Sequence, residues 1–324
     1  METVRTLGKN GPNVSSIGLG LAALGRPGYI NLGHAGDLEK DYEPARMQER
    51  AHAVLDAAWR GGVRYFDAAR SYGRAEEFLA KWVMARGLTR SDVTIGSKWG
   101  YAYTAGWRTD ADVHEVKEHS LSQFRQQREE TRALLGGHLA VYHIHSATLS
   151  SGAFESPDLL RAVAALREEG VIPGLSLSGP EQARALGRAL EVRADGRPAF
   201  GCVQATWNVL EPSAGQALAE AHAAGWGVIV KEALANGRLT SRNTEPESAA
   251  LLAQLQHDGP ADAVALAAAL AQPWADVVLS GAATVEQLES NLGALELQPD
   301  VEALLAFAEP PTLYWNKRAD LAWN

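Results

Sequence analysis

Four polar side chains of different chemistry stand at or just after the ends of short apolar runs: Asp67, Tyr72, Lys98 and His145. When a carbonyl is reduced, its oxygen must collect a proton, and a tyrosine can supply it. A lysine cation lowers the pKa of such a phenol, an aspartate holds the lysine in place, and a histidine hydrogen-bonds the growing charge. Together the four residues predict acid–base chemistry at a carbonyl or an alcohol.

The runs that precede these residues must be strands if the four side chains are to meet. Short apolar runs alternate along the chain with longer segments of helical period. Alternating units imply parallel strands joined by crossover helices, and eight of them favour an α/β fold, the (β/α)8 TIM barrel; an open doubly wound sheet is the alternative. The carboxyl ends of barrel strands form one mouth, where active sites lie. The predicted strands are residues 17–21, 65–68, 93–98, 140–145, 171–178, 202–206, 227–230 and 277–279.

The remaining segments complete one domain over residues 1–324. Residues 1–16 predict an N-terminal hairpin, and residues 296–324 predict a C-terminal extension with a short helix and an aromatic tail. Thr284 stands three residues before Gln287, the spacing of a capping box at a helix start. The predicted helices are residues 45–60, 74–85, 112–134, 157–168, 180–192, 213–223, 246–256 and 284–295.

A glycine pattern near the N-terminus offers a second interpretation. Gly18, Gly20 and Ala23 spell G-x-G-x-x-A, the phosphate turn of Rossmann folds, which requires a helix to begin at the turn. The following residues include Gly25, Pro27 and further glycines and cannot form that helix. We therefore expect these glycines to allow close approach to a ligand at the barrel mouth.

Composition excludes several classes of protein. Hydrophobic residues make up 46% of the chain, so extensive disorder is excluded, and a net charge of −9 argues against nucleic-acid binding. The single cysteine, Cys202, excludes an internal disulfide, and the nine-residue apolar run Ala263 to Ala271 is too short to cross a bilayer. We expect a cytoplasmic protein with no membrane partner. No metal is expected, because the other histidines lack the spacing of metal ligands. The oligomeric state is left open.

These residues give the chain a resemblance to a known family. It resembles the aldo-keto reductases from Val14 to about Leu295, with Asp67 and Tyr72 in F-D-A-A-R-S-Y-G, Lys98 in S-K-W-G and His145 in V-Y-H-I-H. The resemblance implies that Tyr72 is the general acid–base. It also implies a nicotinamide cofactor lying across the barrel mouth without a Rossmann fold.

The resemblance also implies positions for that cofactor. Gln204 and Ser178 match residues that bond the carboxamide, and Trp207 matches the ring that stacks on the nicotinamide. Lys231 and Arg238 lie in the loop expected to wrap the pyrophosphate. The full set of expected cofactor-binding residues is Gly20, Leu21, Ser178, Gln204, Trp207, Lys231, Leu234, Gly237, Arg238, Gly281, Thr284, Gln287 and Asn291.

The sequence gives less direct indications of which nicotinamide cofactor is used and which residues contact the substrate. The family leans to NADP(H), but Gly281 and Gln287 stand where many NADP-preferring members carry a lysine and an arginine, so NAD(H) is the alternative. Trp99 and Tyr101 are expected to line a substrate pocket. Tyr314, Trp315 and Trp323 near the C-terminus either fold over that pocket or pack on the barrel flank.

The expected function is hydride transfer between a nicotinamide cofactor and a small carbonyl or alcohol, either an aldehyde, a ketone or a sugar (EC 1.1.1.-). Two alternatives remain at this stage. One is a regulatory subunit that senses the nicotinamide cofactor with little or no turnover. The other is a hydrolase or isomerase built on the same barrel.

Overall fold

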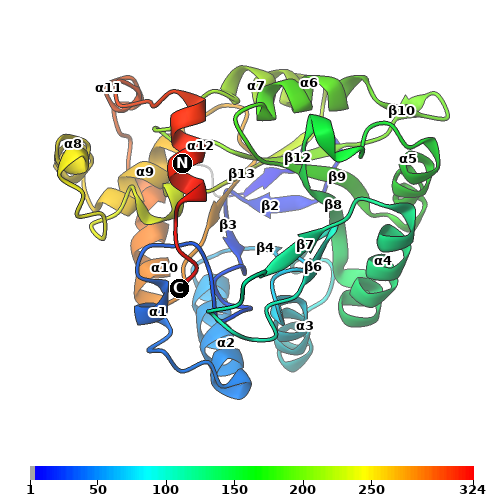
Figure 1. Cartoon of the computed structure of the whole chain (residues 1–324), viewed down its shortest axis with the longest axis horizontal. Coiled ribbons are helices and arrows are strands. Elements are labelled where there is room, and N and C mark those ends of the chain that lie inside the picture. The colour runs from blue at the N-terminus through cyan, green and yellow to red at the C-terminus, as the bar shows by residue number, and fades with distance from the viewer. Residues whose placement is uncertain (1–3) are drawn as a thin grey trace.

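The computed structural model describes residues 4–324, in which eight parallel strands close into a barrel inside a ring of helices (Figure 1). Each strand pairs with the next one along the chain, and the first pairs with the last. The predicted fold class is confirmed, and the strand ends differ from prediction by one or two residues. The barrel strands are β3 (Ile17–Gly20), β4 (Tyr65–Asp67), β5 (Thr94–Trp99), β8 (Leu139–Ala147), β9 (Ile172–Leu177), β12 (Cys202–Thr206), β13 (Gly227–Lys231) and β14 (Val277–Ser280).

One principal helix follows each strand and covers the outside of the barrel. Several begin at signals that are legible in the sequence: Ser156 caps α5 by accepting a hydrogen bond from the amide of Leu159, with Pro157 in the first turn. The outer helices are α2 (Pro44–Arg60), α3 (Ala75–Arg86), α4 (Leu121–Leu135), α5 (Pro157–Ala164), α6 (Gln182–Glu191), α7 (Gly215–Ala223), α9 (Ala261–Leu270) and α10 (Val285–Leu292), with α8 (Ala249–His257) placed before α9. No helix within residues 4–324 is long and apolar enough to cross a membrane.

The N-terminal hairpin of β1 (Val4–Thr6) and β2 (Asn13–Ser15) packs against the end of the barrel away from its mouth. Leu7 and Val14 join the cluster formed by Tyr65, Cys202 and Ile229 inside the barrel. Residues 1–3 of the predicted hairpin segment lie outside the described residues. The hairpin thus shields the core at the end where the strands begin.

Two helix predictions were wrong in part. The predicted helix 112–134 begins only at Leu121, because Ser120 caps it and residues Glu115–Lys117 instead form β7, which pairs with β6 (Tyr101–Tyr103). Helix α9 was not predicted. Its sequence is apolar on nearly every side and therefore shows no helical period, and nine of its residues are buried.

The loop after β3 excludes a Rossmann turn. It contains the short helix α1 (His34–Asp37), and the first long helix starts only at Pro44. Gly18 serves packing instead: a Cβ there would come within 2.9 Å of the side chains of Val277, Leu279 and Tyr65. This long loop is free to lie across the barrel mouth.

The C-terminal extension contains α11 (Val301–Leu305) and α12 (Pro311–Ala319), and its tail returns to the loop after β3 (Figure 1). Asn324 and Tyr29 exchange backbone hydrogen bonds of 3.1 and 3.3 Å. Both expected arrangements of the aromatic residues occur, because Tyr314 and Trp315 pack in a flank cluster while Trp323 lines a cavity at the mouth.

Candidate active site

The barrel brings the four strand-end residues together, as their spacing predicts. Asp67 ends β4 and Lys98 lies one residue before the end of β5, and their side chains form a buried ion pair with exposures of 3% and 0%. Lys98 Nζ also donates to the carbonyl of Ala68 at 3.0 Å. Gln204 on β12 donates to the other Asp67 oxygen at 2.9 Å. The lysine is therefore held in one position by its neighbours on two strands.

Tyr72 lies in the loop after β4, between Lys98 and His145. Lys98 Nζ is 4.7 Å from the centre of the Tyr72 ring, and the His145 ring centre lies 5.4 Å away in an edge-on arrangement. Burial raises the pKa of Tyr72 well above its usual value, the charge of Asp67 raises it further, and Arg26 lowers it. The net shift is therefore upward, opposite to the lowering that was expected from Lys98.

His145 is a neutral imidazole at the mouth. Burial, followed by the charges of Lys98 and Lys231, lowers its pKa well below the usual value. Its Nδ1 lies 3.4 Å from Ser71 Oγ, and its backbone carbonyl accepts from His119 Nε2 at 2.8 Å. A neutral, oriented imidazole can donate one hydrogen bond to an oxygen that gains charge.

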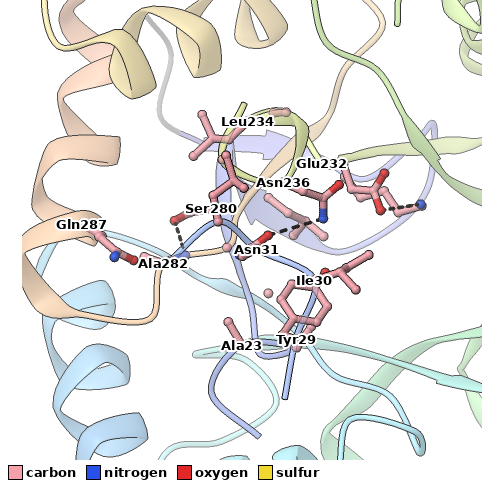
Figure 2. A pocket seen from close by; sticks show the side chains of 18 of the residues that line it. Ala23, Tyr29, Ile30, Asn31, Glu232, Leu234, Asn236, Ser280, Ala282 and Gln287 are labelled. Atoms are coloured by element: carbon pink, nitrogen blue, oxygen red, sulfur yellow. Dashed lines mark hydrogen bonds and ion pairs between the residues drawn. The ribbon is translucent and has the colours of Figure 1, made fainter. Parts of the chain in front are cut away.

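Asp67, Tyr72 and His145 form one end of a cavity of about 470 Å³ that extends to the start of α10, while the fully buried Lys98 does not line it. Figure 2 shows its walls, with Tyr29 to Asn31 on one side and Leu234 and Asn236 on the other. A volume of this size is typical of sites for small molecules and cofactors. Of the predicted site residues, those that line the cavity are Gly20, Asp67, Tyr72, His145, Gln204, Lys231, Leu234, Gly237, Gly281, Gln287 and Asn291.

Trp99, Leu21 and Tyr101 were predicted to belong to the site but do not line the cavity. Trp99 follows Lys98 directly, so its side chain faces the opposite side of β5, where it is fully buried against Phe124 of α4. Leu21 is likewise buried in the hydrophobic core. Tyr101 is not among the lining residues, although its ring centre lies 5.0 Å from that of His145.

Four expected cofactor contacts also lie elsewhere. Trp207 is 2% exposed and packs edge-on against Trp274, away from the cavity. Arg238 binds Glu309 at 2.6 Å. Thr284 accepts from the amide of Gln287 and so caps α10 as predicted, while Ser178 follows β9 without reaching the lining. The side chains of Trp207, Arg238 and Thr284 thus serve packing, pairing and capping in this structure.

A charged cluster at the end of β13 contains Lys231, which was predicted as a site residue, and Glu232 and Arg318, which were not. Lys231 Nζ donates to Thr206 Oγ1 at 3.0 Å, and burial lowers the pKa of Lys231 to about 8. Glu232, at φ +55°, turns its carboxylate toward Arg318 of α12. Burial acts to raise the pKa of Glu232, but Arg318 and Lys231 outweigh it and hold that pKa at about 2.

Sequence reasoning missed Arg26, which is 3% exposed and lines the cavity beside Tyr72. Its guanidinium lies 5.2 Å from the Tyr72 ring centre and 4.8 Å from that of Trp323. It donates to the Ser71 carbonyl at 3.0 Å and to Glu115 at 2.9 Å. No sequence signal could have found it, because these partners come from three separate segments of the chain.

Metal chemistry has no support in the described part of the chain. Among residues 4–324, no three His, Cys, Asp or Glu side chains come together in a way that could hold a metal ion. The cavity contains an ion pair, a phenol, an imidazole and the start of a helix. These groups suit proton transfer and the binding of a phosphate-bearing molecule.

The fold and the site define a (β/α)8-barrel protein with a cluster of titratable side chains at the carboxyl ends of its strands. The chain belongs to the aldo/keto reductase family, whose model matches residues 16–306. Members of this family are oxidoreductases that use nicotinamide cofactors and small carbonyl substrates.

Similar proteins agree with this assignment. Aldo-keto reductase str7 from Strobilurus tenacellus is 27% identical over 338 residues, covering 94% of this chain and 92% of the relative. Pyridoxal 4-dehydrogenase from Microbacterium luteolum is 26% identical over 41% of this chain and 39% of its own length. Among solved structures, aldo-keto reductase AKR11C1 from Bacillus halodurans matches with a TM-score of 0.70 at 18% identity, covering 96% of this chain and 97% of that one. Glycerol dehydrogenase AKR11B4 from Gluconobacter oxydans matches with a TM-score of 0.70 at 17% identity, covering 95% and 96%.

Proposed function

We propose that the protein is an NAD(P)-dependent oxidoreductase that interconverts a carbonyl and an alcohol, with Tyr72 exchanging the proton. The observation that carries this proposal is the packing of Tyr72 between Lys98 and His145 at one end of the cavity. A phenol beside a cation and a neutral imidazole suits proton transfer to or from an alkoxide. When bound, the nicotinamide supplies or accepts the hydride.

Each of the four residues has a separate task in this proposal. Burial keeps Tyr72 protonated at neutral pH, so it is ready to donate its proton in the direction of reduction. Lys98 stabilises the phenolate left behind, and Asp67 holds Lys98 against the ring. His145, being neutral, orients the substrate oxygen by donating a hydrogen bond.

The cavity fits an extended dinucleotide. Its far end reaches the first turn of α10, so an extended molecule can run from Tyr72 to that helix. Gly281 leaves that approach open, since a Cβ there would meet no atom within 4 Å. The residues that we propose to bind the cofactor are Gly20, Gln204, Lys231, Leu234, Gly237, Gly281, Gln287 and Asn291.

The substrate end is polar and aromatic. Arg26, Glu115 and Arg318 line it together with the rings of Tyr29 and Trp323. Paired carboxylates and guanidinium groups can exchange hydrogen bonds with hydroxyl groups, and rings can pack on a sugar face. We therefore place hydroxylated aldehydes, ketones and sugars before purely apolar carbonyls as substrates.

The chain is also proposed to act as one cytoplasmic domain. Both terminal extensions pack on the barrel, and the only cysteine, Cys202, is buried and unpaired. A chain without disulfides suits a reducing compartment.

A substrate panel tests the proposal directly. Aldehydes, ketones and aldoses are assayed with both cofactors in both directions, and we expect turnover of at least one hydroxylated compound. Tight nicotinamide binding with no turnover of any compound would instead favour a cofactor-sensing regulatory subunit. Failure of either cofactor to change the protein's fluorescence would favour a hydrolase or isomerase.

Replacing Arg26 tests its influence on Tyr72. Arg26→Gln removes a cation near the phenol, so we expect the pKa of Tyr72 to rise and the pH profile of alcohol oxidation to move to higher pH. Glu115→Gln removes the opposing charge and should move the profile down. The measurement is kcat against pH.

The exposed Arg46 provides a matched control, since Arg46→Gln changes the same charge far from the cavity. A shift of both cavity variants in one direction would show that Arg26 and Glu115 serve only to hold the loop. An unchanged profile in both would mean that their charges do not reach Tyr72.

A further inference from the structure

The far end of the cavity is built around the carboxylate of Asp37, the last residue of α1. Asp37 Oδ1 accepts from Gln287 Nε2 of α10 at 2.8 Å, and Oδ2 accepts from Arg242 Nη1 at 2.7 Å. A second bond joins Arg242 to Oδ1, so the arginine binds both oxygens. The side chain is 8% exposed, and partners from two different segments fix its position.

The segment that carries Asp37 is tied across the cavity. The amide of Leu32 donates to the carbonyl of Asn236 at 3.1 Å, and the side chains of Asn31 and Asn236 are joined at 3.4 Å (Figure 2). Asn324 Nδ2 donates to the Asn31 carbonyl at 3.1 Å. These bonds hold the loop after β3 at the cavity, so that the side chain of Asp37 lines the far end of it.

The charge at this end is negative. Among the lining residues near α10, the carboxylates of Asp37, Glu286 and Asp262 stand against the single guanidinium of Arg242. Arg242 is already bound to Asp37. Asp262 accepts a hydrogen bond from Asn291, which neutralises no charge. A dianion placed here would meet excess like charge.

The position of the acid–base centre decides which part of the cofactor lies there. In the proposed function, on which this inference rests, the nicotinamide lies beside Tyr72, so the adenosine half must extend toward α10 and Asp37. The two nicotinamide dinucleotides differ only in this half, where the ribose carries a 2′-hydroxyl in NAD and a 2′-phosphate in NADP.

We infer that the cavity selects NAD(H) over NADP(H) and that Asp37 is the residue that decides it. A carboxylate can accept a hydrogen bond from the ribose hydroxyl, and it repels a phosphate at the same place. The amide of Gln287 donates a hydrogen bond to Asp37 but brings no positive charge that could bind a phosphate. This reverses the order expected from the family resemblance, which placed NADP(H) first.

Equilibrium titration with NADH and NADPH, followed by nicotinamide and tryptophan fluorescence, tests the inference without turnover. We expect the wild-type protein to bind NADH at least ~10-fold more tightly than NADPH, since like charges side by side are costly. Asp37→Asn should reduce this ratio ~10-fold or more, mainly through tighter binding of NADPH.

Arg242→Gln provides the opposite change. It leaves Asp37 without its cation, so the ratio should increase in favour of NADH. A purely structural role of the Asp37–Arg242 pair would weaken both cofactors alike in both variants. Asp41→Asn is the matched control, because Asp41 is an exposed carboxylate in the same loop and pairs with Arg50.

Two outcomes would overturn the inference: NADPH binding as tightly as NADH in the wild-type protein, or a ratio that Asp37→Asn leaves unchanged. If Asp37→Asn fails to fold, the Arg242→Gln ratio decides alone, and a fall or no change counts against the inference. Turnover with NADPH preferred would refute only the choice of cofactor. Absence of binding by either cofactor would refute the proposed function as well.

Discussion

Tyr72→Phe is expected to lower kcat by ~10²-fold or more while leaving the dissociation constant of the nicotinamide cofactor nearly unchanged. The substitution removes only the phenolic oxygen, which is the proposed proton donor. The ring that packs against His145 and faces Lys98 remains. The measurements are steady-state kinetics with the best compound of the panel and a fluorescence titration with NADH and NADPH.

Tyr142→Phe is the matched control for this change. Tyr142 lies on β8 but faces outward, where its hydroxyl is 3.1 Å from Thr131 of α4, so its loss should leave kcat unchanged. A Tyr72→Phe protein that kept more than about a tenth of wild-type kcat would not have lost its acid, and another group would have to supply the proton.

Lys98→Met is expected to have the second-largest effect, and it should affect both activity and stability. The phenolate of Tyr72 loses its nearest cation, so kcat should fall ~10²-fold or more. Asp67, with a side-chain exposure of 3%, loses its ion-pair partner. Leaving a buried charge unpaired costs about 3–5 kcal/mol, which urea unfolding would measure.

The double variant Asp67→Asn with Lys98→Met separates these two losses. Asparagine carries no charge and can still bond Gln204, so most of the lost stability should return. Activity should not return, because the ammonium group of Lys98 beside Tyr72 is still missing. Recovery of kcat in the double variant would mean that Lys98 acts only as a structural partner of Asp67.

The active-site residues predicted from sequence were those whose neighbours in the chain determine their position. Asp67, Lys98 and His145 belong to strands with clear apolar patterns, and the parallel order of those strands brings their ends to one mouth. Tyr72 follows Asp67 closely enough to share that mouth. For these four residues, local pattern and fold class together were sufficient.

Only some of the other predicted site residues line the cavity. Trp99 is next to Lys98 in the chain but lies on the other side of β5, since successive strand residues alternate. Trp207 packs against Trp274 rather than lining the cavity. Whether a side chain beyond a strand end points inward depends on the helices and loops packed around it, and the sequence pattern does not contain that information.

By itself, the sequence determined the barrel, because strand and helix periods reflect which faces of each element are buried. It also determined the four strand-end residues, whose positions follow from those periods. Only the tertiary structure decided what surrounds them. Arg26 meets Trp323, and Asp37 meets Arg242 and Gln287, across separations of more than 200 residues. Such contacts are set by how loops and tail pack over the mouth, and they decide the charge that a cofactor and a substrate would meet.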